Sequence, residues 1–169
     1  MNKVLVIYNS KTGFTKRYAE WLAEEIPCEV LPYDKRDTVK LDDYDAVVFG
    51  GWFHAGTIMG FKWFKEQLPK LAGKAVAVFA TGATPADTPE AREAIANKPA
   101  GDLPFFYFQG GLNYEDMGAG DKLLMAMFRK MVKKMKGPEH EMTNMLGQSY
   151  DISSKDALAP LVEWLNERL

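Results

Sequence analysis

The sequence predicts an α/β fold in which a doubly wound parallel sheet carries helices on both faces. Two observations lead to this prediction. The apolar runs are short and almost continuous, as in strands that are buried on both faces, and Val4-Leu5-Val6-Ile7-Tyr8 is the clearest of them. Between the runs lie stretches in which apolar residues recur about every 3.6 positions, the period of a helix. Regular alternation of strand and helix favours parallel strands joined by right-handed crossovers.

Five strands and four ordinary helices are expected along the chain. The predicted strands are Val4–Tyr8, Glu29–Tyr33, Ala46–Phe49, Lys74–Ala80 and Leu103–Phe108. The predicted helices are Phe14–Ile26, Ile58–Leu68, Thr88–Asn97 and, at the end of the chain, about Ser154 to Arg168. Pro89 falls in a first helical turn, where proline is tolerated, whereas Pro160 is expected to bend the last helix.

The connection from Gln109 to Tyr150 is longer than an ordinary link between a strand and a helix. It contains a methionine-rich stretch, from about Asp121 to Lys136, with the spacing of a helix. A chain of 169 residues has the usual size of one domain. We therefore predict a single domain over residues 1–169 with an inserted helical segment at about 115–148.

Composition narrows the functional classes. Hydrophobic residues make up 47% of the chain and charged residues 26%, as in globular proteins. The formal net charge of −2 argues against nucleic acid as a main partner. One cysteine, Cys28, excludes an internal disulfide and is expected to be a packed thiol. The amino-terminal sequence lacks a signal-peptide pattern, and no apolar run is long enough for a membrane span, so the cytoplasm is the expected location.

The loop after the first strand carries the strongest functional signal. It reads Ser10-Lys11-Thr12-Gly13-Phe14-Thr15, so three hydroxyls and a glycine lie between a buried strand and a helix start. Helix amino-terminal amides attract anions, and hydroxyls donate hydrogen bonds to phosphate oxygens. The alternative is a helix cap, which needs a single hydroxyl. Three hydroxyls favour a phosphate site.

Other classes of phosphate-binding loop have different sequence motifs, which this chain lacks. The chain has no G-x-x-x-x-G-K-[ST] sequence and no G-x-G-x-x-G after the first strand. A phospho-acceptor domain would need carboxylates at the ends of the first and third strands, where this chain has Asn9 and Gly50. These three classes are excluded.

The segment Ser10–Thr15 after Val4–Tyr8 resembles the flavodoxin phosphate loop, [ST]-x-T-G-x-T, and the order of strands and helices is similar to flavodoxin over the whole chain. The resemblance implies a five-stranded sheet of order 2-1-3-4-5 and FMN as the cofactor. It places the FMN phosphate on Ser10, Lys11, Thr12, Gly13, Phe14 and Thr15.

The same resemblance places the flavin ring between two further loops. In the second loop its implied contacts are Gly51, Trp52, Phe53, His54, Ala55 and Gly56, where Trp52 or Phe53 offers a ring for stacking. A Trp-Phe pair that only closes the core is the alternative. In the third loop the implied contacts are Thr81, Gly82 and Ala83, and the stacking tyrosine usual in flavodoxins is absent.

The methionine-rich helix has two interpretations. It carries six basic side chains, Lys122, Arg129, Lys130, Lys133, Lys134 and Lys136. A basic amphipathic helix over Lys122–Lys136 suits an anionic membrane surface or an acidic partner. Alternatively, the methionines pack against the sheet and the lysines are merely solvated.

Three functions are compatible with these features. The first is electron transfer by an FMN protein to a redox partner protein or a quinone. The second follows from Phe108-Gln109-Gly110-Gly111-Leu112-Asn113-Tyr114, which resembles a stretch of the menaquinone-dependent protoporphyrinogen oxidases and implies a flavin-dependent oxidoreductase. The third, an FMN-dependent NAD(P)H:quinone reductase, has no sequence signature. No acid–base pair or nucleophile stands out, so any chemistry is expected to run through the flavin.

Overall fold

A computed structural model describes residues 2–169 and divides the chain into two compact units. The first unit runs to Gly110 and resumes over Ser153–Leu169, and the second is Gly111–Ile152. The elements of each unit follow separately.

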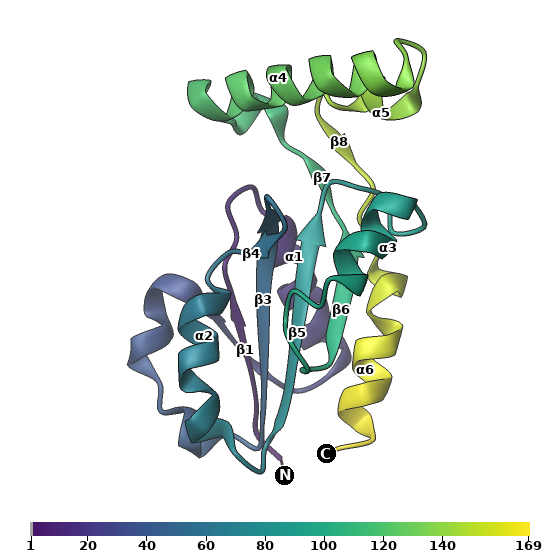
Figure 1. The fold of residues 1–169 in the computed structure, drawn as a ribbon. Coiled ribbons are helices and arrows are strands. Elements are labelled where there is room, and N and C mark those ends of the chain that lie inside the picture. The colour runs from purple at the N-terminus through teal and green to yellow at the C-terminus, as the bar shows by residue number, and fades with distance from the viewer. Residues whose placement is uncertain (1) are drawn as a thin grey trace. The chain divides into compact units, whose positions relative to one another are not determined.

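The first unit is built on a parallel sheet (Figure 1). Its strands are β1 (Val4–Tyr8), β2 (Glu29–Pro32), β3 (Ala46–His54), β5 (Ala75–Gly82) and β6 (Phe105–Gln109). They lie in the order β2-β1-β3-β5-β6, and neighbours on this path are parallel. In sequence order these are the first to fifth parallel strands, so the predicted order 2-1-3-4-5 and the α/β fold class are confirmed.

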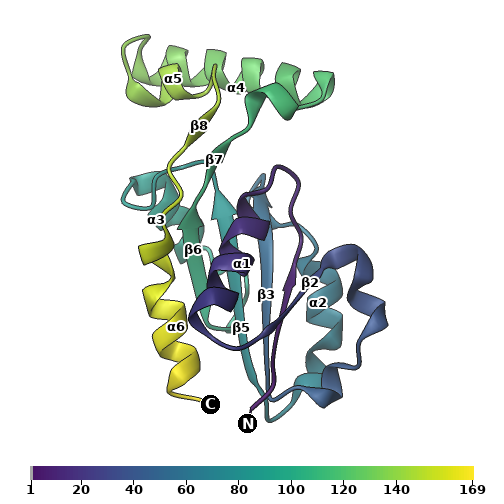
Figure 2. The ribbon, with the colours of Figure 1, turned by 180° about the vertical axis from the view of Figure 1, so that it is seen from behind.

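Helices cover both faces of this sheet. The helices are α1 (Phe14–Glu25), α2 (Phe61–Gln67), α3 (Pro89–Ala96) and α6 (Ala159–Asn166). Figure 1 looks onto α2 and α3, and Figure 2, turned by half a revolution, looks onto α1 and α6. Alternate residues of β1 serve the two sides: Val4 and Val6 pack with α1 and α6, and Leu5 and Ile7 pack with α2. Because both faces are buried, the strands carry continuous apolar runs.

β3 and β5 extend further than predicted. The predicted end of β3 was Phe49, but the strand continues to His54 and pairs with a short antiparallel strand, β4 (Thr57–Ile58). β5 continues to Gly82. The first residues of the second and third predicted loops therefore belong to strands β3 and β5. The side chains of these residues point alternately to the two faces of the sheet.

Short 3-10 helices in the first unit escaped prediction because they are too short to show a period. They are η1 (Tyr33–Thr38), η2 (Leu41–Asp43), η3 (Leu68–Leu71) and η5 (Lys155–Leu158). The last predicted helix, about Ser154 to Arg168, is divided into η5 and α6, and Pro160 lies in the first turn of α6, where proline is tolerated.

The second unit is a helical insertion on a two-stranded stem. β7 (Gly111–Leu112) pairs antiparallel with β8 (Tyr150–Asp151), and η4 (Tyr114–Asp116), α4 (Ala119–Lys136) and α5 (Glu141–Met145) lie between them. α4 begins two residues before the predicted start. Over residues 2–169, no helix combines the length and the apolarity that crossing a membrane requires.

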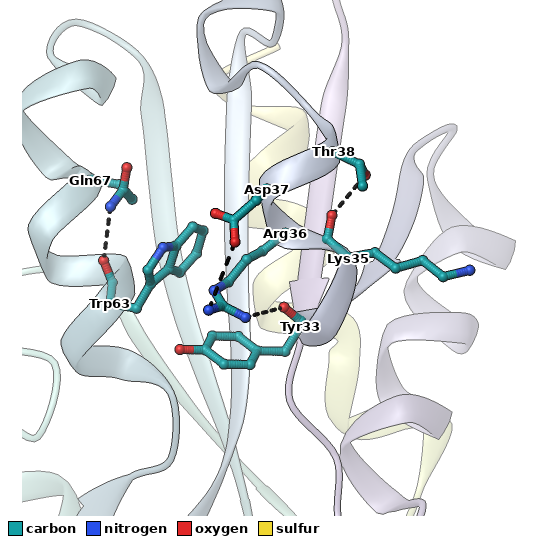
Figure 3. A network of polar contacts seen from close by, with 7 residues as sticks. All are labelled: Tyr33, Lys35, Arg36, Asp37, Thr38, Trp63 and Gln67. Carbon is teal, nitrogen blue, oxygen red and sulfur yellow. Dashed lines mark hydrogen bonds and ion pairs between the residues drawn. The ribbon is translucent and has the colours of Figure 1, made fainter.

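A cation–aromatic cluster holds the connection after β2 (Figure 3). The Arg36 guanidinium carbon lies 4.1 Å from the Tyr33 ring centre and 5.4 Å from that of Trp63 on α2. Its Nη1 donates a hydrogen bond of 2.9 Å to the Tyr33 carbonyl, and its Nη2 lies 3.8 Å from Asp37. Tyr33 also borders Gly60, where an added Cβ would come within 3.1 Å of the ring. Arg36 thus ties η1 to α2.

Replacing Arg36 by alanine is expected to lower the free energy of unfolding by about 1–2 kcal/mol, because two ring contacts and one hydrogen bond are lost. Arg36→Lys keeps the charge but not the planar stack, so it should recover only part of the loss. Urea denaturation followed by circular dichroism measures both variants. An Arg36→Ala protein as stable as the wild type would mean that the cluster contributes nothing.

Candidate functional site

The carboxyl ends of β1, β3 and β5 bring three loops to one edge of the sheet. These strands are neighbours in the sheet, and ligands of open α/β sheets bind at this edge. Asn9 N–H donates to the Gly50 carbonyl at 2.8 Å, which joins the first loop to β3. Gly110 N–H donates to the Gly82 carbonyl at 2.8 Å, which joins the ends of β6 and β5.

The first loop opens α1 without a side-chain cap at its N-cap position. That position is Gly13, whose φ of +100° lies in the left-handed region that favours glycine. The first turn, Phe14-Thr15-Lys16, contains no acidic residue. Ser10 Oγ accepts a hydrogen bond of 3.2 Å from Gly13 N–H, so the loop folds back on itself ahead of the helix. The helix start is therefore electropositive and suited to an anion.

Thr15 has a position that the sequence did not indicate. Its hydroxyl lies 2.7 Å from the Thr81 hydroxyl at the end of β5, and both residues are buried. Thr15 therefore links the first loop to the third. The neighbouring Phe14 is buried beside Gly110, where an added Cβ would lie 3.0 Å from the Phe14 ring. In the same loop, Lys11 is exposed and Thr12 is half-buried.

The two aromatic residues of the second loop point to different neighbours. Trp52 is half-buried, with the Lys11 ammonium 5.4 Å from its ring centre and the His54 ring at the same distance. Phe53 instead packs against Phe105 and Tyr107, at centroid distances of 6.0 Å and 5.8 Å. Trp52 is thus the aromatic residue of the second loop that contacts the first loop, through Lys11. Phe53 instead packs against the core on the α2 side of the sheet.

Ala55 and Gly56 form the turn between β3 and β4. Both have positive φ, +48° and +80°, and they follow His54, which pairs with Thr57. Two left-handed residues match the twist of a tight antiparallel hairpin. Gly51 lets β4 pack closely, since an added Cβ would lie 2.5 Å from Ile58 and 2.7 Å from the Met59 carbonyl.

The third loop is held by side chains of β6. Tyr107 donates a hydrogen bond of 2.6 Å to the Thr84 carbonyl, and its ring covers Gly82, where an added Cβ would lie 2.4 Å from the hydroxyl. Gln109 Oε1 accepts a hydrogen bond of 3.0 Å from Ala86 N–H. Ala83 is half-buried between these contacts. Tyr107 and Gln109 were not among the predicted site residues. A signal for them was present in the sequence, because polar residues two positions apart at a strand end lie on the same face of the sheet and can reach the same loop.

A hollow of about 590 Å³ lies at the opposite, amino-terminal end of β5 and β6. Its two cations are already engaged: Lys74 donates to the carbonyls of Asp42 and Tyr44, and Arg168 stacks on Trp164 at 4.4 Å. The hollow therefore offers no spare charged group to a ligand. The three loops at the carboxyl edge are the better candidate.

The described residues offer no metal centre, because no group of three or more His, Cys, Asp or Glu is placed to hold an ion. Burial raises the pKa of the Cys28 thiol to about 11, so the thiol is protonated at neutral pH and a weak nucleophile.

Comparison with known proteins identifies the family. The profile of the flavodoxin domain matches residues 5–139, which is more than half of the chain. Among solved structures, oxidised flavodoxin 2 from Bacillus cereus aligns with a TM-score of 0.55 at 17% identity, covering 99% of both chains.

Two further structures align less closely. The Trp repressor binding protein from Bacillus subtilis has a TM-score of 0.47 at 17% identity, covering 65% of this chain and 85% of its own. A flavoprotein in complex with FMN from Lactobacillus acidophilus has a TM-score of 0.45 at 20% identity, covering 64% and 93%. No protein of curated function matches the sequence significantly.

Fold and site thus define an α/β protein with three loops gathered at the carboxyl edge of a parallel sheet. The chain belongs to the flavodoxin domain family. The predicted resemblance to flavodoxin is confirmed, and with it FMN as the cofactor of the family.

Proposed function

We propose that this protein binds FMN at the carboxyl edge of its sheet and transfers electrons between redox partners. The observation that carries the proposal is the start of α1. A glycine N-cap, an acid-free first turn and hydroxyls on both sides of the glycine lie together at the end of a central strand. A phosphate monoester there would complete the helix cap that the N-cap glycine does not supply.

The residues proposed to contact FMN divide between its phosphate and its ring. The phosphate site comprises Ser10, Lys11, Thr12, Gly13, Phe14 and Thr15. Because Thr15 is bonded to Thr81, its main role is to fix the first loop against the third. Backbone N–H groups at the start of α1, with the Thr12 hydroxyl, are the proposed donors to phosphate.

The ring site comprises Gly51, Trp52, Phe53, His54, Ala55 and Gly56 from the second loop and Thr81, Gly82 and Ala83 from the third. Within it, Trp52 is the proposed stacking residue, because it lies beside Lys11 of the first loop. Phe53 and Gly82 both pack against Tyr107 of β6, which is proposed to hold the second and third loops in place around the ring. Bound FMN would supply the electron-accepting and electron-donating chemistry, and the protein would bind and orient it.

We propose that the two compact units work as one domain of residues 1–169, with the insertion at about 115–148 as its accessory segment. The proposed partner is a redox protein or a quinone. The basic segment Lys122–Lys136 is the proposed contact surface for a membrane or an acidic partner.

The inserted unit also favours a second candidate. The predicted likeness to quinone-linked protoporphyrinogen oxidases depends on the stretch from Phe108 to Tyr114 ahead of a helical insert, and a helical insertion does lie between β6 and α6. In that case the protein would be a flavin-dependent oxidoreductase.

Stepwise anaerobic reduction of the FMN-loaded protein separates the two candidates. Two resolved one-electron steps support the electron carrier. A single two-electron step, with oxidation of a porphyrinogen coupled to quinone reduction, supports the oxidoreductase and contradicts the carrier.

Lys11 is expected to raise the reduction potential of bound FMN, because its ammonium favours the negative charge of the reduced flavin. Lys11→Gln should lower the ratio of reduced to oxidised flavin at a fixed potential about tenfold, which is about 59 mV for a one-electron step. Spectroelectrochemistry measures the shift. Lys16→Gln is the control, since Lys16 is exposed and lies 3.6 Å from Glu20 on α1. Equal potentials for wild type and Lys11→Gln would contradict the proposed position of the flavin.

A further inference from the structure

One face of α4 gathers most of the exposed large apolar side chains. Among the described residues, six of the eight such side chains belong to this helix. Their exposed fractions are 64% for Leu123, 50% for Leu124, 63% for Met127, 41% for Phe128, 49% for Met131 and 74% for Met135. Exposed apolar groups are ordinary when scattered, but a contiguous set on one helix marks a binding surface.

The other side of α4 is occupied within its own unit. Val132 is buried, as are Thr143 of α5 and Leu146 just after it. Arg129 Nε donates a hydrogen bond of 2.9 Å to the Thr143 carbonyl, and the Thr143 hydroxyl donates one of 3.1 Å to the Gly137 carbonyl. α5 is thus folded back onto α4, and this contact uses the side that carries Val132 and Arg129.

Helical geometry gathers the exposed residues into a stripe. At 100° per residue, Leu124, Met127, Phe128, Met131 and Met135 fall within an arc of about 100°. One edge of this stripe is bordered by Lys130 and Lys134, both exposed. The other edge passes into the side packed on α5.

Charge on α4 is strongly biased. It carries the six basic residues of the Lys122–Lys136 segment and one acidic residue, Asp121, which lies in the first turn. There a carboxylate complements the positive end of the helix dipole. The last turn carries Lys133, Lys134 and Lys136. A helix with an apolar stripe, bordering lysines and a net positive charge matches an interfacial helix.

We propose that the stripe of α4 docks on an anionic lipid bilayer and lies in the plane of the interface. The methionine, leucine and phenylalanine side chains enter the boundary between headgroups and acyl chains. Lys130 and Lys134 extend their stems along that boundary and pair with lipid phosphates. Complementarity between the basic helix and anionic headgroups selects this occupant. A lipid surface also accommodates a convex row of flexible side chains without a matching groove, which an acidic protein would have to provide.

Docking on a bilayer specifies which partner the Lys122–Lys136 segment contacts, and it rests on the proposed function. Lipid binding is measured without added FMN, and FMN binding is measured without lipid. Failure of one is therefore distinguishable from failure of the other.

The test is co-sedimentation of the full chain with vesicles of phosphatidylcholine, with and without phosphatidylglycerol. Two double variants address the two components: Met127→Gln with Met131→Gln for the stripe, and Lys130→Gln with Lys134→Gln for the charge. The matched control is Lys62→Gln with Lys65→Gln, which removes two exposed lysines from α2.

Wild type and control are expected to bind anionic vesicles and to release them at high salt. The lysine variant should bind roughly 30-fold more weakly, from about two lost lysine–headgroup contacts. The stripe variant should lose binding to a similar extent, with an unchanged circular dichroism spectrum. The proposal is overturned if wild type does not prefer anionic over neutral vesicles. It is also overturned if the variants bind vesicles like wild type but lose binding to an acidic protein or to a second copy of the chain.

Discussion

Thr12→Asp is expected to weaken FMN binding by at least about 100-fold, because a carboxylate about 4 Å from a phosphate repels it by about 1–4 kcal/mol per pair of unit charges. The same carboxylate lies ahead of an acid-free helix start, where it stabilises the helix dipole by about 0.5 kcal/mol. The variant apoprotein should therefore be as stable as wild type or slightly more so. Loss of affinity without loss of stability distinguishes a phosphate site from a simple helix cap.

The control for this prediction is Thr12→Asn, which keeps the size of the aspartate and removes its charge. Isothermal titration gives the affinities and thermal denaturation gives the stabilities. If the aspartate and asparagine variants bind FMN equally well, the phosphate does not lie at the start of α1.

Tyr18→Phe is expected to lower the free energy of unfolding by about 1–2 kcal/mol, because it leaves two partly buried backbone groups without their partner. Tyr18 is fully buried on α1. Its hydroxyl donates to the Gln109 carbonyl at 2.5 Å and accepts from Ser154 N–H at 3.0 Å. These two residues lie just before and just after the inserted segment in the sequence. Nearby, Arg17 Nη1 donates to the Ser153 hydroxyl at 2.8 Å.

Urea denaturation measures the stability of Tyr18→Phe. The control is Tyr33→Phe, which also removes one tyrosine hydroxyl but keeps the contact of the ring with Arg36. Hydrogen exchange adds a local readout, since the Ser154 N–H should exchange faster in Tyr18→Phe. A Tyr18→Phe protein whose stability and Ser154 exchange both equal those of wild type would show that the hydroxyl does not fasten these segments.

The sheet could be predicted from the sequence because its strands are buried on both faces. Val4–Tyr8 is the same in prediction and structure, and the other four parallel strands differ only at their ends. The short antiparallel strand β4 was not predicted, because Ile58 was assigned to the helix Ile58–Leu68. The largest difference, the extension of β3 to His54, depends on a hairpin with Ala55 at its turn. Alanine is not a left-handed turn former, so no local signal announced that turn.

The position of the first loop between β1 and α1 could be predicted because a strand-to-helix junction is a local feature of the sequence. The support of the third loop could not be predicted. Tyr107 reaches Thr84, and Thr15 reaches Thr81, across neighbouring elements far apart in the sequence. Such contacts depend on the order and register of the strands in the sheet, which cannot be derived directly from a single sequence. For the same reason, the different environments of Trp52 and Phe53 emerged only with the register of β3.

The central claim is tested most directly by titrating the apoprotein with FMN and, separately, with riboflavin, which lacks the phosphate. The account predicts one FMN bound per chain and an affinity for FMN at least about 100-fold higher than for riboflavin, from hydrogen bonds to a charged group. Equal affinity for the two flavins, or no binding of FMN, would contradict it.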